Sequence, residues 1–235
     1  MHISLITLFP EAFSAISAGI TGRALKEGIV TTSFWNPRTY ADNPNGYIDD
    51  RPYGGGPGMV MQAPPIQQAI RAAVANQQGK ALRIYLSPTG EPLNQRRLDQ
   101  IATHDHLVLL CGRYEGIDQR DIDSDIDLEI SIGDIVLSGG ELPAMVLMDA
   151  LIRQQPGALG DEDSYREDSF YHGLLDHPHY TRPKRVENQT VPDILLSGDH
   201  AKITEWRRKT SETLTKMRRP DLWDAYTKQK AEESK

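Results

Sequence analysis

Three glycine- or serine-rich segments of the sequence could hold a ligand through their main-chain groups. They are residues 87–90, 112–116 and 133–140, and each follows a short apolar run. Glycine permits backbone conformations that a Cβ atom forbids, and it lets a ligand approach the main chain closely. The turn at residues 138–140 could equally be a tight connection between a strand and a helix, because isolated glycine turns are weak signals.

Two further glycine motifs lack the residues that would make them nucleotide-binding loops. Residues 54–58 are not followed by the Gly-Lys-Ser/Thr sequence that closes a P-loop. Met59 also stands where the last glycine of the dinucleotide-binding fingerprint should be, and Gly79-Lys80 fails as a P-loop. ATP and NAD are therefore not expected as ligands.

Histidines near the end of the chain raise the question of a metal site. His172, His177 and His179 lie close together in the sequence, but no cysteine or carboxylate joins them at a recognised ligand spacing. We therefore assign no metal-binding residue from the sequence. Cys111 is the single cysteine, which excludes an internal disulfide and fits a reducing cytosol.

Apolar runs alternate with helical patterns in the part of the chain that carries the three segments. Strands are predicted at residues 2–8, 29–35, 81–86, 107–111 and 126–132, and helices at 10–18, 22–27, 64–76, 94–102, 115–121 and 141–153. This alternation predicts parallel βαβ units with buried strands. Ligands of open parallel sheets bind beyond the carboxyl ends of the strands, so we expect the three segments to converge on one pocket.

The composition is that of an ordinary soluble globular protein. The chain has 235 residues, of which 38% are hydrophobic and 25% are charged. No apolar run approaches the roughly 20 residues of a membrane helix, and the start of the chain lacks the basic region and cleavage site of a signal peptide. We expect a cytoplasmic protein without a membrane partner.

Charge is distributed unevenly along the chain. The formal net charge of −7 argues mildly against nucleic acid as a partner, but residues 202–219 are predominantly basic. Residues 157–183 are polar and irregular, which predicts a linker or mobile loop. Two helices are predicted after it, at 199–217 and 221–231, and the first carries an apolar stripe that suggests a small packed core.

Four motifs resemble those of the bacterial tRNA (guanine-N1)-methyltransferases, which are SPOUT-class enzymes that use S-adenosylmethionine. They are CGRYEGID (111–118), SIGDIVLSGGELPAM (131–145), EDSF (167–170) and HYTRP (179–183). FPEAF (9–13) and YGGGPGMVM (53–61) also fit this family. The resemblance covers almost the whole chain, in order.

The resemblance implies an α/β fold with a parallel sheet, helices on both faces and a trefoil-knotted cofactor region. Knots are so rare that strand order alone would not suggest one. The implied division is a SPOUT domain that binds S-adenosylmethionine (1–160), an interdomain linker (161–180) and a small helical C-terminal domain that binds tRNA (181–235). Ile135 stands where many relatives have an aromatic residue, and residues 163–166 match no pattern of the family.

The cofactor contacts carried over from the family lie in the three segments and beside them. They are Tyr85, Leu86, Ser87, Pro88, Gly112, Tyr114, Glu115, Ser131, Ile132, Gly133, Asp134, Ile135, Val136, Leu137, Gly139, Gly140 and Pro143. An adenine ring needs an apolar slot together with backbone donors and acceptors, which such segments supply.

Methylation at N1 of guanine requires a base that removes the N1 proton and a cation near O6, where negative charge gathers. The resemblance assigns the first role to Asp168 and the second to Arg153. From position alone, Asp168 would be a solvated linker acid and Arg153 a cation at a helix C-terminus.

The resemblance also implies the partners. It suggests a homodimer with a shared active site, a linker that orders when tRNA binds, and a flipped-out target guanine at tRNA position 37, preceded by another guanine. The family is associated with Mg²⁺ dependence. The basic residues expected to hold the tRNA backbone are Arg207, Arg208, Lys209, Arg218 and Arg219. A related enzyme that methylates ribose 2′-oxygens and a non-catalytic RNA-binding protein remain alternatives.

Overall fold

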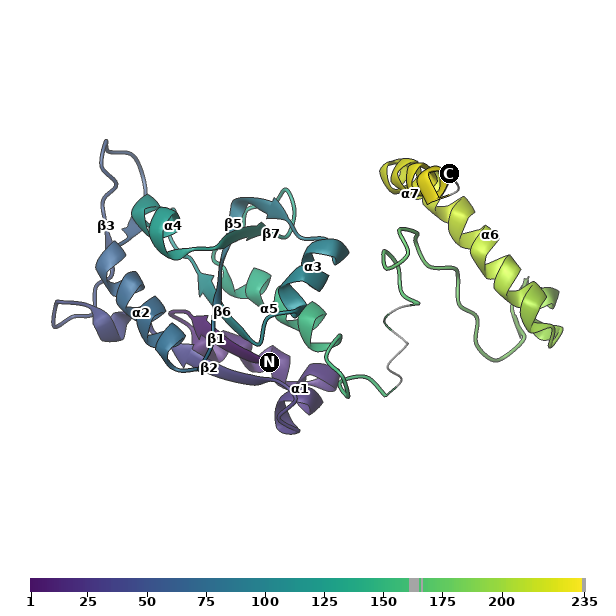
Figure 1. Ribbon diagram of the computed structural model, residues 1–235, viewed down its shortest axis with the longest axis horizontal. Coiled ribbons are helices and arrows are strands. Elements are labelled where there is room, and N and C mark those ends of the chain that lie inside the picture. Colours follow the sequence, from purple (N-terminus) through teal and green to yellow (C-terminus); the bar gives the residue numbers. More distant parts are fainter. Residues whose placement is uncertain (161–164, 166, 234–235) are drawn as a thin grey trace. The chain divides into compact units, whose positions relative to one another are not determined.

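Five parallel strands form the sheet at the centre of the first of two units in this computed structural model (Figure 1). The structure describes residues 1–160, 165 and 167–233, and the units are Met1–Glu162 and Asp163–Lys235. The strands, in the order β2-β1-β6-β5-β7, are β2 (Thr31–Trp35), β1 (His2–Ile6), β6 (His106–Cys111), β5 (Leu82–Pro92) and β7 (Leu128–Ser131). Every pairing between them is parallel.

Alternate residues of the strands enter two separate cores, because successive side chains of a strand point to opposite faces. Leu107 and Leu109 of β6 belong to one core, and Val108 and Leu110 belong to the other. All six residues of β6 are buried, which explains why its sequence is a continuous apolar run.

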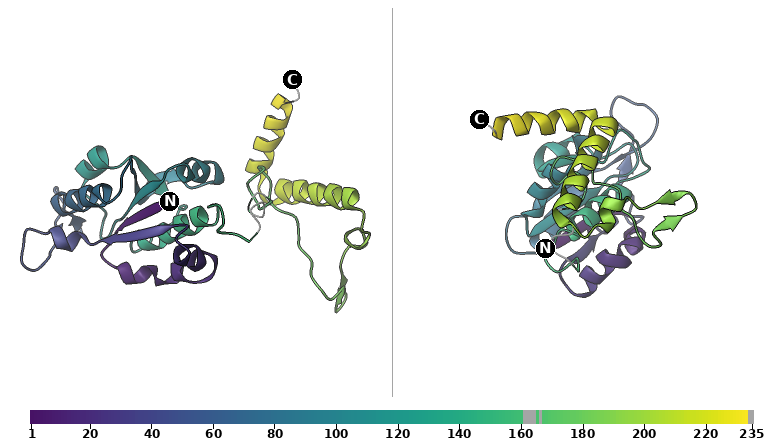
Figure 2. Two further views of the ribbon diagram at one scale, coloured as in Figure 1. Left: turned by 60° about the horizontal axis from the view of Figure 1, so that its bottom comes forward. Right: turned by 90° about the vertical axis from the view of Figure 1, so that its right-hand side faces the viewer.

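Helices cover both faces of the sheet, as the left view of Figure 2 shows. One face carries η1 (Pro10–Ser17), α1 (Gly19–Lys26), α3 (Gln95–Ala102) and α5 (Glu141–Ile152). The other carries η2 (Pro37–Tyr40), α2 (Ala63–Ala75) and α4 (Gln119–Asp125). The prediction of an α/β fold with a parallel sheet between two helical layers is confirmed.

Several element boundaries differ from the prediction, and two of the differences change the carboxyl edge of the sheet. β5 does not end at Leu86: after a bulge it resumes and pairs with β7 again, so that Ile130 lies opposite both Leu86 and Glu91. α4 begins at Gln119, and not at Glu115, because the side chain of Asp118 caps it by accepting a hydrogen bond from the Arg120 N–H at 2.9 Å.

The chain that leaves β7 returns to the end of β6. Gly140 N–H donates to the Gly112 carbonyl at 2.9 Å, and a Cβ atom on Gly140 would lie 2.7 Å from Cys111 Cα. Only glycine permits this close approach. Since β5 stands between β7 and β6 in the sheet, residues 132–139 pass the carboxyl end of β5 on the way.

A short antiparallel pair, β3 (Asp49–Asp50) and β4 (Val60–Met61), lies within the long connection between β2 and α2. Met61 also bridges to Ile117, which joins this loop to the chain after β6. Among the described residues, no helix has both the length and the apolar character needed to cross a membrane.

The second unit is built around two helices, α6 (His200–Arg218) and α7 (Pro220–Glu233), close to the two predicted. It also contains η4 (Asp193–Leu196) and a hairpin of β8 (Arg185–Val186) and β9 (Gln189–Thr190), visible in the right view of Figure 2. Thr215 of α6 is buried, and its hydroxyl accepts a hydrogen bond from Leu175 N–H at 2.8 Å. The irregular segment before α6 is thus held against the helix. The predicted boundaries at residues 160 and 180 stay predictions.

Candidate functional site

A cavity of about 380 Å³ lies at the carboxyl ends of β5, β6 and β7. All three glycine-rich segments contribute to its lining. Every predicted cofactor contact lines the cavity except Gly133 and Asp134. Their contact with a cofactor stays a prediction, but the expected convergence of the segments is present.

Several lining residues were missed by the sequence analysis. They are Thr89, Arg113, Gly116, Ile117, Gln119, Ile122 and Ile130. Gln119 and Ile122 enter the lining because α4 begins later than predicted, which places its first turns beside the cavity. Arg113, Gly116 and Ile117 lie in the CGRYEGID motif, so treating that motif as one unit would have found them.

Tyr85 supplies a buried aromatic ring to the lining. Burial raises the pKa of its hydroxyl, and the nearby charge of Glu129 raises it further, while a hydrogen bond with the Ile117 backbone acts in the opposite direction. The phenol is therefore neutral, and it offers the cavity an apolar face with one polar tip.

An ion pair behind the cavity joins three of the sequence motifs. Glu141, at the start of α5, is buried and lies 2.9 Å from Arg113 Nη2, and it accepts a hydrogen bond from Thr7 Oγ1 at 2.8 Å. The Arg113–Glu141 contact lacks hydrogen-bond geometry, so it acts as two charges at short range. The guanidinium also lies 4.4 Å above the Phe9 ring and donates to the Ser138 carbonyl.

Cys111 lies beside this pair and is buried. Burial raises the pKa of its thiol well above the usual value, and the charge of Glu141 adds to the rise, while Arg113 lowers it. The thiol is protonated and unreactive, because the thiolate is the nucleophilic form. Cys111 therefore acts as a small core residue.

The YGGGPGMVM loop contacts Glu115 and Gly116, two residues that line the cavity. Glu115 N–H donates to the Met59 carbonyl and Met61 N–H donates to the Gly116 carbonyl, each at 2.9 Å. A Cβ atom on Gly58 would overlap the Glu115 carboxylate, and the φ of Gly58 is +85°. The backbone conformation favours glycine there, and a Cβ atom would also displace the Glu115 side chain. The loop thereby fixes Glu115 at the cavity.

Large apolar side chains are exposed beside the cavity. Ile135 and Val136 are 55% and 84% exposed, and Leu142 and Val146 of α5 are 57% and 48% exposed. Leu142 and Val146 lie one helical turn apart, so they share a face of α5. Exposed apolar surface of this kind is typical of interaction sites.

The two predicted catalytic residues belong to different units. Arg153 caps the C-terminus of α5, where its N–H donates to the Asp149 carbonyl at 3.1 Å. Asp168 lies in the second unit, in a turn where Ser169 Oγ accepts a hydrogen bond from Asp176 N–H at 2.9 Å. Of residues 163–166, whose contacts the sequence left open, all but Tyr165 lie outside the described residues.

The basic residues of the second unit differ in how far their charge is neutralised. Arg208 forms ion pairs with Glu205 and Glu212, Lys209 pairs with Glu205, and Arg219 pairs with Asp221. Within the described part of the chain, Arg207 and Arg218 form no ion pair. Arg207 lines a second cavity, of about 800 Å³, together with Trp206 and residues 177–184.

The described residues contain one group of His, Cys, Asp or Glu side chains that could hold a metal ion: Asp176, His177 and His179. Asp176 was not among the residues considered from the sequence, and its carboxylate lies beside both imidazoles. Two imidazoles and a single carboxylate do not suit Mg²⁺, which prefers oxygen ligands. This group therefore does not account for a Mg²⁺ requirement.

Comparison with known proteins gives consistent matches over nearly the whole chain. The model of the family "tRNA (Guanine-1)-methyltransferase TrmD" matches residues 1–225. This chain is also similar to proteins named tRNA (guanine-N(1)-)-methyltransferase. The protein of that name from Neisseria meningitidis serogroup C is 54% identical to it over 223 residues, and the one from Dechloromonas aromatica is 57% identical over 228 residues. Each alignment covers 94% of this chain and 90% of the relative. A third, from Aromatoleum aromaticum, is 55% identical over 236 residues, covering 98% of this chain and 90% of the relative.

Proposed function

This chain belongs to the tRNA (guanine-1)-methyltransferase family and is a tRNA (guanine-N1)-methyltransferase, and we propose that it moves the methyl group of S-adenosylmethionine to N1 of the guanine at tRNA position 37. The family resemblance of the sequence motifs is thereby confirmed. The observation that carries the proposal is the convergence of three motif segments on one cavity at the carboxyl edge of the sheet.

The cavity fits S-adenosylmethionine in size and chemistry. Its volume of about 380 Å³ lies within the roughly 300–1,000 Å³ of typical ligand pockets. Leu86, Ile130 and Ile132 offer an apolar slot for adenine, while the glycines of the three segments expose main-chain donors and acceptors. When bound, the cofactor supplies an electrophilic methyl group on a sulfonium centre.

The remaining chemistry falls to two side chains of the protein. Asp168 accepts the N1 proton of guanine as N1 acquires the methyl group, which a carboxylate within hydrogen-bond reach can do. Arg153 places its positive charge near O6, where negative charge develops as the proton leaves. A general base alone contributes about 10²- to 10⁴-fold to such rates.

A homodimer with a shared active site is proposed on the same grounds. Arg153 and the cavity belong to the first unit and Asp168 belongs to the second, so each site can combine Arg153 of one subunit with Asp168 of the other. The exposed apolar residues of α5 and of the 135–137 segment support a subunit interface on the first unit.

Further features of the proposal rest on the family and on particular contacts. The return of residues 132–140 past β5 to the end of β6 supports a trefoil knot around the cofactor. Residues 181–235 would bind tRNA through their basic side chains, after the 161–180 linker orders on it. A cytoplasmic location and a Mg²⁺ dependence are part of the same proposal.

The experiment is methyl transfer from labelled S-adenosylmethionine to two tRNA transcripts that differ only at position 37, guanine or adenine, followed by nucleoside analysis. We expect 1-methylguanine on the first and no product on the second. Label on a ribose, or on both transcripts, would reject the proposed chemistry. Binding of both ligands without transfer would favour a non-catalytic RNA-binding protein.

A further inference from the structure

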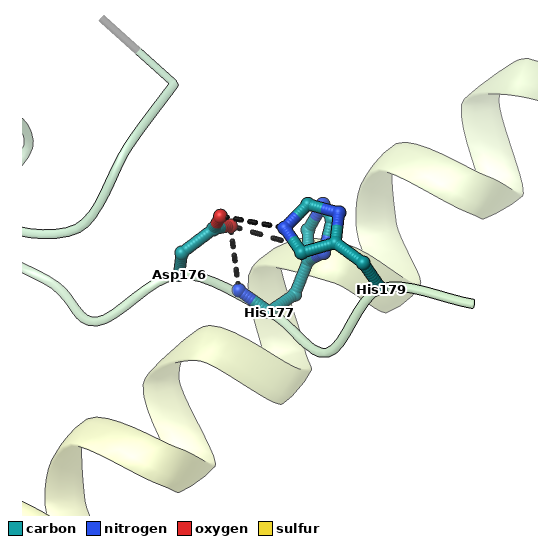
Figure 3. Close-up of side chains that lie close together, drawn as sticks. All are labelled: Asp176, His177 and His179. Carbon is teal, nitrogen blue, oxygen red and sulfur yellow. Dashed lines mark hydrogen bonds and ion pairs between the residues drawn. The ribbon is translucent and has the colours of Figure 1, made fainter. Parts of the chain in front are cut away.

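The side chains of Asp176, His177 and His179 converge in the second unit (Figure 3). One ligand atom from each lies within 4.8 Å of the other two. His179 Nε2 is 2.8 Å from Asp176 Oδ2, and His177 Nδ1 is 3.8 Å from Asp176 Oδ1. The two imidazole rings are 4.6 Å apart between centroids. A single carboxylate therefore faces two imidazoles.

The main chain and α6 hold this group in place. Asp176 is fixed from two sides, because its N–H donates to Ser169 Oγ and its Oδ1 accepts a hydrogen bond from His177 N–H at 2.6 Å. The His177 ring lies 6.5 Å from the Trp206 ring of α6. Pro178 restricts His177 to extended conformations, which helps His179 to return to the carboxylate. The ligand atoms are thus arranged in advance.

One polar atom of the group is unexplained by the protein alone. His177 Nδ1 is buried, and among the described residues it has no hydrogen-bond partner. Its distance of 3.8 Å from Asp176 Oδ1 is too long for a hydrogen bond. Buried polar atoms are normally paired, so an atom left in this state next to a carboxylate points to a bridging group.

A metal ion would bridge these atoms at suitable distances. Ligand atoms about 2.0–2.2 Å from a tetrahedral Zn²⁺ lie roughly 3.3–3.6 Å from one another. The observed separations of 2.8 and 3.8 Å from the carboxylate oxygens lie on either side of this range. Small side-chain rotations would therefore complete the site. Bonds from His179 and Asp176 to the ion would then replace the hydrogen bond between these two side chains.

We propose that Asp176, His177 and His179 bind one divalent transition-metal ion, with Zn²⁺ as the best fit. Two imidazoles and a carboxylate are preferred by Zn²⁺, Co²⁺ and Ni²⁺, whereas Mg²⁺ and Ca²⁺ require a shell of oxygens. Three protein ligands leave a coordination position open to water or to another ligand. This site would therefore not account for a Mg²⁺ dependence of methyl transfer.

The ion would also stabilise the turn that carries the base. Asp176 is hydrogen-bonded to Ser169, the neighbour of Asp168, and His177 contacts Trp206 of α6. An ion on Asp176 and His177 would fasten residues 168–170 to that helix. This consequence rests on the proposed role of Asp168, whereas ion binding itself does not.

The test is titration of the untagged full-length protein with Zn²⁺ by calorimetry, and with Co²⁺ by visible absorption, without tRNA or S-adenosylmethionine. We expect one ion per chain, with an affinity that falls about tenfold or more in Asp176→Asn and His179→Asn. His179 is 73% exposed in its side chain, so His179→Asn should fold normally.

His172→Asn is the matched control. His172 lies in the same segment and its ring contacts Tyr171, but it is not part of the group. Its substitution should leave the affinity unchanged. The proposal is overturned if the wild-type protein binds no ion at micromolar Zn²⁺, or if His179→Asn and His172→Asn bind equally well. Because no methyl-transfer reagent is present, these outcomes do not depend on the proposed function.

Discussion

The carboxylate of Glu141 lies 2.9 Å from the guanidinium of Arg113 and connects the first turn of α5 to the loop after β6. The acid is almost fully buried, and Thr7 adds a hydrogen bond from the end of β1. An acidic side chain is favoured at a helix N-terminus, where the backbone N–H groups carry partial positive charge. Three distant segments of the chain are thus joined behind the cavity by one side chain.

We predict that Glu141→Ala lowers the free energy of unfolding by about 2–3 kcal/mol. Removing one partner of a fully buried ion pair costs about 3–5 kcal/mol, and the partial exposure of Arg113 reduces that figure. Urea unfolding measures the change. Glu11→Ala, at an exposed position of η1, should change stability by less than about 0.5 kcal/mol, and an equal loss in both variants would contradict the argument.

Gly58→Ala is predicted to weaken S-adenosylmethionine binding by about tenfold, because its Cβ atom would displace the Glu115 side chain at the cavity. Gly54→Ala is the control. Gly54 has nearly the same φ, +86° against +85°, but a Cβ atom there meets no neighbour within 4 Å. Calorimetric titration with the cofactor should separate the two variants, and equal affinities would show that backbone strain, and not Glu115, decides the effect.

Asp121 should make the protein less stable as the pH rises. The carboxyl is fully buried, and burial raises its pKa to about 7, while a hydrogen bond from Gln67 acts in the opposite direction. Between about pH 4, the unfolded value, and pH 7, the folded state binds the proton and the unfolded state does not. Stability is therefore full below about pH 4 and falls as the pH rises through 7.

The variant Asp121→Asn removes this dependence. It should be more stable than the wild type at pH 8, and the difference should shrink as the pH is lowered to 5. Urea midpoints at several pH values measure it. Asp123→Asn, at an exposed position of the same helix, should show no such trend, and a parallel pH profile in wild type and Asp121→Asn would refute the assignment.

Arg207 is predicted to contribute more to tRNA binding than its neighbour Arg208. The charge of Arg208 is engaged by Glu205 and Glu212, whereas Arg207 has no ion pair among the described residues. Arg207→Ala should reduce the slope of log affinity against log salt by about 0.7–0.9, the value for one phosphate contact. Filter binding at several salt concentrations tests this, with Arg208→Ala expected to change the slope less.

A shared active site predicts complementation between two inactive variants. In co-expressed Asp168→Asn and Arg153→Ala chains, random pairing makes about half of the dimers mixed. Each mixed dimer has one site with both wild-type residues, so about a quarter of the wild-type activity should return. Each variant alone should lose about 10²-fold or more. No recovery in the mixture would place Arg153 and Asp168 of one site in the same subunit.

Local sequence patterns were sufficient for most strands and helices, but not where a distant segment decides the structure. β6 was predictable because it is a continuous apolar run bounded by turn residues, and α5 because its apolar residues recur with the period of a helix. The resumption of β5 after Pro88 depends on its second pairing with β7, which lies forty residues away. Glu115 and Gly116 are excluded from α4 because their backbone groups pair with Met59 and Met61.

The candidate sites show the same limit. The convergence of three segments followed from the rule that ligands bind at the carboxyl ends of parallel strands. The same rule could not predict that Gln119 and Ile122 line the cavity, because their position depends on where α4 begins. Asp176 was not predicted because its spacing to His177 and His179 matches no recognised ligand pattern, and the three side chains are seen together only in the structure.

The path from β7 back to Gly112 has a consequence for the order in which the molecule is made. As the ribosome releases the chain, β1, β2, β5 and β6 can assemble before residues 132–143 exist. The cavity gains its third wall only when Gly140 reaches β6, so the capacity to bind a ligand arises last in this unit. A ligand therefore binds only chains in which Gly140 has already reached β6, and by mass action it stabilises those chains against unfolding.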